Sequence, residues 1–183
     1  MSKILSIITP TSRERAVFLD RMLCCLAPQM RGEVEHIVLS DNGYMSLGKK
    51  MNHLYQMVSG KYVTVVNDDD LVPENYIDII LDAAKTDKDI LLGKIMSGWV
   101  NGINTTLEQF KVLESTQIYH RYENVIPAKT ELVVPLAVWN ESKEMTYRQD
   151  SNLSTLIGEA AKSVYDTDAI LYYHMRQTQL RVT

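Results

Sequence analysis

Three consecutive aspartates, Asp68, Asp69 and Asp70, follow Asn67 directly after the apolar run 61–66 (KYVTVV). Adjacent carboxylates repel one another, so such a cluster needs a cation or well-placed hydrogen-bond donors to offset its charge. Mg²⁺ and Mn²⁺ bind oxygen ligands, and Mg²⁺ sites commonly combine one or two carboxylates with substrate phosphates. The cluster therefore predicts a divalent-cation site for a phosphorylated ligand. A solvated acidic turn that caps the next helix is the alternative.

Near the end of the chain, His174 and Arg176 lie in the segment YYHMRQTQ. Histidine is a common metal ligand and arginine pairs well with phosphate, so both residues are candidates for the same site. A lone histidine near a terminus is more often uninvolved, which is the alternative for His174. Trp99 and Trp139 could stack on a sugar ring, although tryptophan more often packs in a core.

The segments that must position these residues alternate between strand and helix patterns. Apolar, β-branched runs predict strands, and apolar residues at helical spacing predict helices. The predicted strands are 3–9, 35–39, 61–66, 89–96, 107–113 and 164–173, and the predicted helices are 14–27, 47–58, 151–162 and one that Pro73 opens. This alternation predicts βαβ units and an α/β fold with a mostly parallel central sheet flanked by helices. Ligands in such sheets bind beyond the carboxyl ends of the strands, and the aspartates follow a strand at such an end.

Length and composition predict one ordinary globular domain of 183 residues. The net charge of −4, without a Lys/Arg run, argues against tight nucleic-acid binding and leaves a transient nucleic-acid substrate open. No run approaches the roughly 18 apolar residues that span a bilayer. The start, MSKILSIITP, lacks the apolar region and cleavage site of a signal peptide. We therefore expect a cytoplasmic protein without membrane insertion.

The segment GKKMNHLYQMVSGKYVTVVNDDDLVPENY resembles the metal-binding core of the inverting family 2 glycosyltransferases of GT-A fold. In that family a Gly-x-Lys-x-Asn helix start is followed by Gly-x-Tyr, a strand and an Asp-rich DxD-type motif. The spacing from Asn52 to Gly60 fits that pattern, and the loop TPTSRER and the turn SDNG also resemble the family. Three positions depart from it: Ser40 and Asn67 stand where an acid is usual, and Gln149 replaces the first acid of a Glu-Asp pair.

The resemblance implies a Rossmann-like GT-A fold in a single domain over 1–183, with a nucleotide-sugar-binding half, 1–96, and an acceptor-binding half, 97–183. It also implies an enzyme that moves a sugar from a nucleotide sugar, by default a UDP-sugar, to an acceptor hydroxyl with inversion. Mn²⁺ or Mg²⁺ would be its cofactor. Small stand-alone proteins of this kind occur in bacteriophages, in which case the host cytoplasm is the expected location. The acceptor would be a glycan or a modified DNA base.

By the same resemblance, Asp69 would be the main metal ligand, with Asp70 and His174 as further ligands. Arg176 would contact the diphosphate. The residues expected to border the donor nucleotide are Thr9, Pro10, Thr11, Arg13, Asp41, Lys50, Asn52, Asn67 and Asp68.

Asp150 would be the catalytic base, because the resemblance places a carboxylate at this point and direct displacement needs a base on the acceptor side. A plain helix N-cap is the alternative for Asp150. Gln149, Trp99 and His120 are the expected acceptor contacts.

Two other functions compete with sugar transfer. A nucleotidyltransferase also pairs a carboxylate-bound metal with a nucleotide, but the loop TPTSRER lacks the glycines of its usual phosphate loop. A non-catalytic module that only binds nucleotide sugars is compatible with Ser40, Asn67 and Gln149. The retained Asp69 and Asp150 favour activity.

Overall fold

The first strand of the chain lies between two parallel neighbours at the centre of a sheet. The computed structural model describes residues 2–100, 110–113, 126–141 and 149–177. In it β1 (Leu5–Ser12) pairs in parallel with β2 (Val34–Asp41) and with β3 (Tyr62–Val65). Leu5, Ile7 and Ile8 are fully buried, as expected for consecutive residues of a parallel strand whose sheet is covered on both faces.

Four further strands complete this sheet in the described part of the chain: β4 (Ile90–Val100), β5 (Phe110–Leu113), β6 (Ala128–Lys129) and β7 (Val164–Gln177). The strand order is β2-β1-β3-β6-β4-β5, and β7 pairs with β4 in parallel. β5 runs antiparallel to β4, and β6 runs antiparallel to both β3 and β4. Most residue pairs in the sheet are parallel, which confirms the predicted α/β architecture. The two-residue β6, which joins the two halves, has no strand pattern in the sequence.

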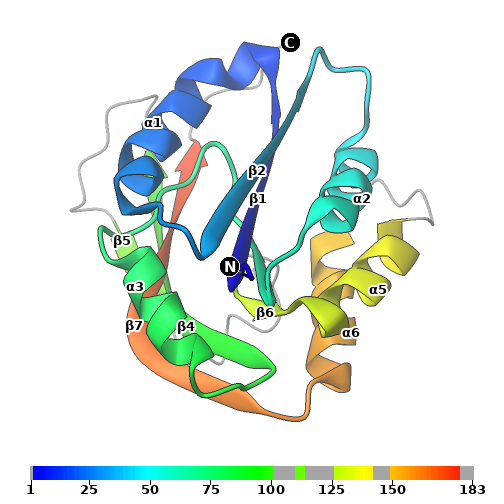
Figure 1. Cartoon of the computed structure of the whole chain (residues 1–183). Coiled ribbons are helices and arrows are strands. Elements are labelled where there is room, and N and C mark those ends of the chain that lie inside the picture. The colour runs from blue at the N-terminus through cyan, green and yellow to red at the C-terminus, as the bar shows by residue number, and fades with distance from the viewer. Residues whose placement is uncertain (1, 101–109, 114–125, 142–148, 178–183) are drawn as a thin grey trace.

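Helices cover both faces of the sheet (Figure 1), with α1 and α3 on one side and α2, α5 and α6 on the other. Their bounds, with two short 3₁₀ segments, are η1 (Arg13–Arg15), α1 (Ala16–Leu26), η2 (Ala27–Gln29), α2 (Leu47–Met57), α3 (Tyr76–Ala84), α5 (Thr130–Glu141) and α6 (Gln149–Ala160). The predicted helices are all present, and α6 begins two residues earlier than its sequence pattern indicates.

The helix α5 is absent from the sequence prediction. Pro135 lies inside it, and proline removes a helical hydrogen bond, so the segment reads poorly as a helix. In the structure Val133 and Ala137 of α5 are buried, and this burial of apolar side chains favours the helix despite the proline.

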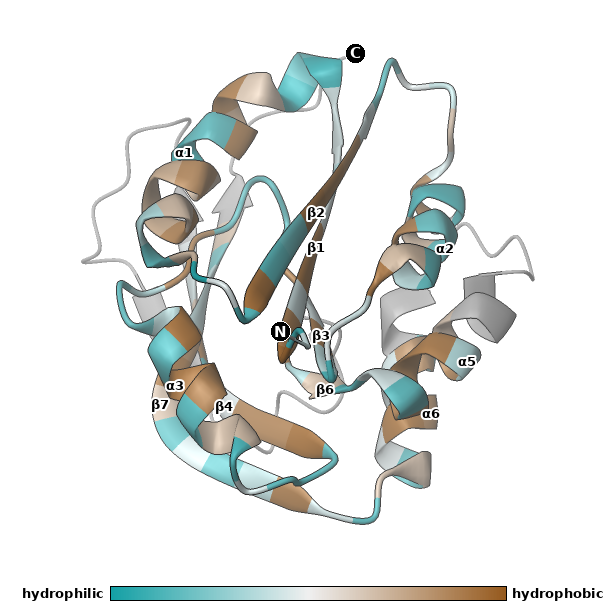
Figure 2. Ribbon diagram, in the orientation of Figure 1, coloured by the Kyte–Doolittle hydropathy of each residue, from teal (hydrophilic) through white to brown (hydrophobic). Residues whose placement is uncertain are grey.

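Apolar side chains form one core between the layers. Figure 2 shows β4 as a predominantly hydrophobic strand, whereas the helices alternate between hydrophobic and hydrophilic residues. Four tyrosines, Tyr55, Tyr62, Tyr76 and Tyr172, are among the largest fully buried side chains. No helix among the described residues is both long enough and apolar enough to cross a bilayer.

We predict that Gly60→Ala destabilises the fold, because an added Cβ would lie 2.6 Å from the Ser6 backbone nitrogen and 2.7 Å from the Leu5 carbonyl carbon. The backbone must shift to relieve this overlap, which costs about 1–3 kcal/mol. Denaturant unfolding measures the loss. Gly32→Ala is the matched control, since nothing lies within 4 Å of its added Cβ; it should change stability by less than about 0.5 kcal/mol. Equal stabilities for the two variants would contradict the prediction.

Candidate functional site

A pocket of about 240 Å³ lies at the carboxyl ends of β1 and β3. It is lined by three segments: the end of β1 with η1, the start of α2, and the acidic loop, which we define as residues 67–70. The lining residues are Pro10, Thr11, Ser12, Arg15, Leu47, Lys50, Asn67, Asp68 and Asp69. Six residues predicted for the site therefore lie together beyond the carboxyl ends of these strands: Pro10, Thr11, Lys50, Asn67, Asp68 and Asp69.

Asp68 is the buried anchor of the acidic loop, with 4% of its side chain exposed. Thr11 Oγ1 donates to Asp68 Oδ2 at 2.6 Å, while Arg15 donates through Nε at 2.8 Å to Oδ2 and through Nη2 at 2.7 Å to Oδ1. A forked guanidinium–carboxylate pair of this kind fixes geometry as well as charge. Asp68 therefore joins the acidic loop to the end of β1 and to η1.

Asp69 is more accessible than Asp68, the other carboxylate that lines the pocket, with 28% of its side chain exposed. Arg15 Nη2 lies 2.8 Å from its Oδ2, and Arg21 donates to its backbone carbonyl. Burial and the neighbouring charge of Asp70 raise the pKa of Asp69, although Arg15 acts in the opposite direction. Asp69 therefore carries negative charge that the described residues offset only in part.

Asp70 faces away from this pocket and holds the acidic loop against β7. Tyr172 donates its hydroxyl to Asp70 Oδ2 at 2.8 Å, and the Met175 backbone N–H donates to Oδ1 at 2.7 Å. The Asn67 side-chain amide also donates to Oδ2, at 3.2 Å, and its backbone N–H donates to the Tyr172 hydroxyl at 3.0 Å. His174 Nδ1 lies 3.4 Å from the Asp70 carboxylate. These contacts occupy Asp70, so its clearest role is to dock the C-terminal strand.

Lys50 and Asp41 form a buried ion pair beside the pocket, with Lys50 Nζ 2.5 Å from Asp41 Oδ1. Lys50 also donates to the Thr11 carbonyl at 2.6 Å. The contact with Lys50, together with the Met45 backbone N–H, lowers the pKa of Asp41 to about 2. Asp41 is therefore ionised at neutral pH, and the pair braces the loop between β2 and α2 against the end of β1.

Four of the predicted donor residues, Thr9, Arg13, Asp41 and Asn52, lie outside the pocket lining. Thr9 is fully buried and donates to the Val66 carbonyl at 2.7 Å. Its hydroxyl oxygen also lies 2.9 Å from His36 Nε2, and burial lowers the pKa of that histidine to about 4. Arg13 is exposed on η1, and Asn52 is half-buried on α2. Pro10, Thr11, Lys50, Asn67 and Asp68 do line the pocket, and Asp41 contacts it through Lys50.

The remaining predicted residues are placed only by their backbone or not at all. Gln149 and Asp150 form the start of α6, Trp99 lies in β4, and Arg176 lies in β7 two residues after His174. His120 falls outside the described residues.

The helix α6 begins toward the end of the domain that carries the acidic loop. Its far end lies at the amino ends of β3 and β4, where the Lys162 backbone N–H donates to Asp89 Oδ2 at 2.9 Å and the Lys129 N–H donates to the Asp89 carbonyl at 2.8 Å. The helix runs back from there toward the carboxyl end of β3 (Figure 1).

Besides the lining residues Ser12 and Leu47, the sequence prediction missed Arg15 and Tyr172, which hold the acidic loop in place. The sequence offers Arg13 and Arg15 in the same loop, and only the 3₁₀ turn decides that Arg15 contacts the carboxylates while Arg13 is exposed. Tyr172 is one of two adjacent tyrosines in β7, and only the tertiary contact with Asp70 distinguishes it.

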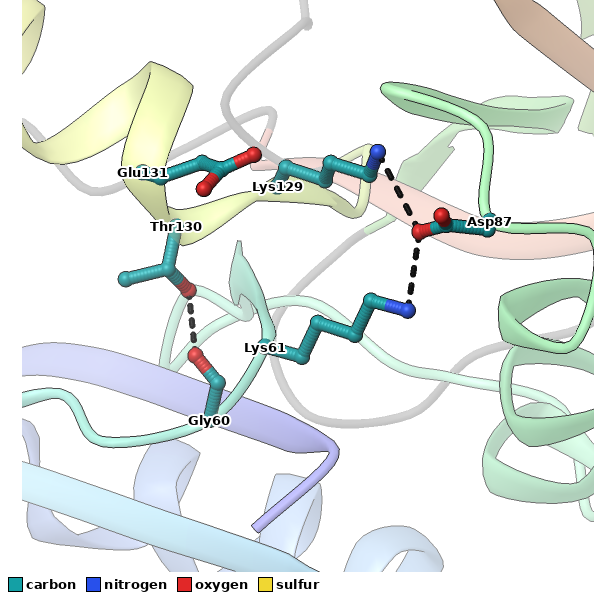
Figure 3. A pocket seen from close by; sticks show the side chains of 6 residues that line it. All are labelled: Gly60, Lys61, Asp87, Lys129, Thr130 and Glu131. Carbon is teal, nitrogen blue, oxygen red and sulfur yellow. Dashed lines mark hydrogen bonds and ion pairs between the residues drawn. The ribbon is translucent and has the colours of Figure 1, made fainter. Parts of the chain in front are cut away.

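A second hollow, of about 480 Å³, lies at the opposite, amino end of β3 (Figure 3). Lys61 and Lys129 project into it and both contact Asp87, with Nζ–Oδ1 distances of 2.8 and 3.2 Å. Lys129 also lies 3.2 Å from Asp89. The lysines of this hollow are therefore already paired with carboxylates, and no predicted site residue lies there.

Similarity searches connect this chain with solved structures but not with sequence families. No protein-family model matches the chain, and no curated protein matches it. Among solved structures, S. aureus TarS has a TM-score of 0.69 at 20% identity, over 94% of this chain and 36% of that one. The structure of S. aureus TarS 1–349 in complex with UDP has a TM-score of 0.69 at 19% identity. The structure of TarS 1–349 in complex with UDP-GlcNAc has a TM-score of 0.67 at 18% identity. These two matches cover 94% and 97% of this chain and 60% of TarS 1–349.

This likeness establishes the fold. The predicted GT-A type of α/β domain is confirmed, and this chain spans between about a third and three fifths of the length of the structures it matches.

We predict that Tyr172→Phe destabilises the domain by about 1–3 kcal/mol, because the partly buried Asn67 N–H loses its acceptor and the buried Asp70 loses a donor. Thermal or denaturant unfolding measures the change. Tyr165→Phe, at an exposed position of the same strand, serves as the control and should leave stability nearly unchanged. A Tyr172→Phe variant as stable as this control would show that the hydroxyl does not hold the acidic loop against β7.

Proposed function

We propose that this domain is a metal-dependent glycosyltransferase that moves a sugar from a nucleotide sugar, most simply a UDP-sugar, to an acceptor hydroxyl with inversion. One observation carries the proposal: Asp69 and the cations Arg15 and Lys50 line one pocket at the carboxyl edge of the sheet. A complex of a metal ion with a nucleoside diphosphate needs a carboxylate to bind the metal and positively charged groups to bind the diphosphate. Structures of the same fold contain UDP and UDP-GlcNAc, which supports this choice of ligand.

The donor nucleotide would lie between the end of β1 and the start of α2. Pro10, Thr11 and Leu47 supply the walls there, and the Lys50–Asp41 pair lies beside them. Each carboxylate oxygen has two lone pairs, so Asp41 retains the capacity to accept a hydrogen bond from a nucleobase. Lys50 contributes positive charge near the phosphates.

The residues of the pocket fit a divalent cation whose coordination is completed by oxygens of the bound substrate. Among the described residues, no group of three or more His, Cys, Asp or Glu side chains is arranged to hold a metal. A single accessible carboxylate, Asp69, with partly uncompensated charge matches the preference of Mg²⁺ for one or two carboxylates plus substrate phosphates. Asp69 would hold the ion with Asp68 beside it, and His174 is a further candidate ligand. A bound cation would stabilise the charge that develops on the departing diphosphate.

Asp150 is the proposed base. At the start of α6 it would take the proton of the acceptor hydroxyl as that oxygen attacks the anomeric carbon. The direction of α6, which begins toward the acidic-loop end of the domain, supports this assignment. The acceptor, a glycan or a modified DNA base, would then contact the half over 97–183, with Gln149, Trp99 and His120 as candidate contacts. Arg176 on β7 would reach the diphosphate.

The test of the function is to incubate the protein with UDP-sugars and Mn²⁺ and to measure release of UDP. Sugar transfer, or slow hydrolysis of the donor, supports the enzyme. Donor binding without any turnover would instead support a non-catalytic module.

We predict that Asp69→Ala weakens Mn²⁺-dependent binding of UDP by at least about tenfold, since the accessible carboxylate of the pocket is lost. Isothermal titration with and without Mn²⁺ measures this effect. Asp82→Ala removes an exposed aspartate on α3, 75% of whose side chain is exposed, and should bind UDP as the wild type does. Unchanged UDP affinity of Asp69→Ala in the presence of Mn²⁺ would refute the assignment.

We also predict that Asp150→Asn leaves UDP-sugar binding intact and lowers turnover by about a hundredfold or more, the usual effect of losing a general base. Binding and UDP release are measured on the same preparation. Glu159→Gln, at an exposed position of the same helix, controls for loss of a charge from α6. Near-normal turnover of Asp150→Asn would place the base elsewhere.

A further inference from the structure

Arg15 already occupies the carboxylates that the proposed function assigns to a metal. Its Nε and Nη2 atoms form the fork on Asp68, and Nη2 also lies 2.8 Å from Asp69 Oδ2. The guanidinium packs over the Phe18 ring, 5.2 Å from its centroid, and 41% of the side chain is exposed. It is therefore held in place, yet it remains accessible from the pocket that it lines.

The two carboxylates hold Arg15 unequally. Asp68 is nearly fully buried, receives both arms of the fork and is also fixed by Thr11. Asp69 is more exposed, and Arg15 contributes a single nitrogen to it. Breaking the contact with Asp69 leaves the fork on Asp68 intact, so the Asp69 contact is the exchangeable one.

We propose that Arg15 is a resident cation of the acidic loop, which offsets part of the charge of Asp69 in the free protein and must release Asp69 before a divalent ion binds there. This inference rests on the proposed function and concerns the regulation of the same site. A divalent ion at Asp69 would lie close to the guanidinium, and like charges at such distances repel strongly in a partly buried pocket. The metal on its own is therefore disfavoured.

A nucleoside diphosphate removes this obstacle. Its oxygens offer a new anionic partner to the guanidinium N–H that Asp69 gives up, while the fork on Asp68 stays in place. The metal and the diphosphate then favour each other, and by linkage each raises the affinity of the other by the same factor. Arg15 thus makes the domain bind the ion tightly only when the donor is present.

The experiment measures Mn²⁺ affinity by titration with electron paramagnetic resonance, with and without UDP, for the whole chain and its variants. In the wild type, UDP should tighten Mn²⁺ binding by about tenfold or more. Arg15→Gln should bind Mn²⁺ alone about three- to tenfold more tightly than the wild type, and the tightening by UDP should shrink. If Arg15 merely shaped the acidic loop, the same variant would bind Mn²⁺ alone more weakly.

Two further variants test whether the effect on Mn²⁺ binding comes from Arg15 itself. Arg15→Lys keeps the charge without the fork, so its affinity for Mn²⁺ alone should fall between those of the wild type and Arg15→Gln; it also serves if Arg15→Gln folds poorly. Arg31→Gln is the matched control. Arg31 also forms an ion pair with an aspartate, Asp78 on α3, and a similar fraction of its side chain, 42%, is exposed, but it does not line the pocket. It should leave both affinities within about twofold of the wild type.

The outcomes separate this inference from the function on which it rests. Equal or weaker binding of Mn²⁺ alone by Arg15→Gln, with Asp69→Asn abolishing Mn²⁺ binding, overturns the role of Arg15 and leaves the metal site standing. Absence of Mn²⁺ binding by the wild type even with UDP overturns both.

Discussion

Compensation of three adjacent carboxylates at the end of a buried strand is the constraint on which this structure depends. Each aspartate meets it differently. Asp68 is paired with Arg15 and Thr11, Asp70 is held by donors from β7, and Asp69 is offset only in part. Since leaving a buried carboxylate without partners is unfavourable by several kcal/mol, the acidic loop can be stable only when η1 and β7 both dock against it.

These contacts connect segments near both ends of the sequence with the acidic loop in its middle. The pairs between Arg15 and Asp68 and between Tyr172 and Asp70 join residues that are far apart in sequence. The isolated bridge between Leu71 and Tyr173 continues the second of these links. Asp69, the accessible carboxylate, is therefore flanked by residues that are held in place by these contacts, as a preorganised binding site requires.

The two ends of the sheet differ in how their charges are used. At the amino end, Lys61 and Lys129 are paired with Asp87 and Asp89, so the hollow there is electrostatically satisfied. At the carboxyl end, burial and the charge of Asp70 raise the pKa of Asp69, Arg15 offsets its negative charge only in part, and Arg15 remains accessible. This asymmetry, rather than the size of either hollow, identifies the carboxyl edge as the place where a charged ligand would bind.

The sequence by itself determined the α/β class, the predicted helices and strands, and the position of the acidic loop after a buried strand, because these depend on local periodicity and on short-range order. Only the tertiary structure decided that Arg15 rather than Arg13 contacts the carboxylates, that Asp70 docks β7, and that Thr9 is buried. Helix α5 and strand β6 also needed the folded chain. The physical reason is common to all of them: each depends on a partner distant in sequence, and no local pattern records which side chain that partner will meet.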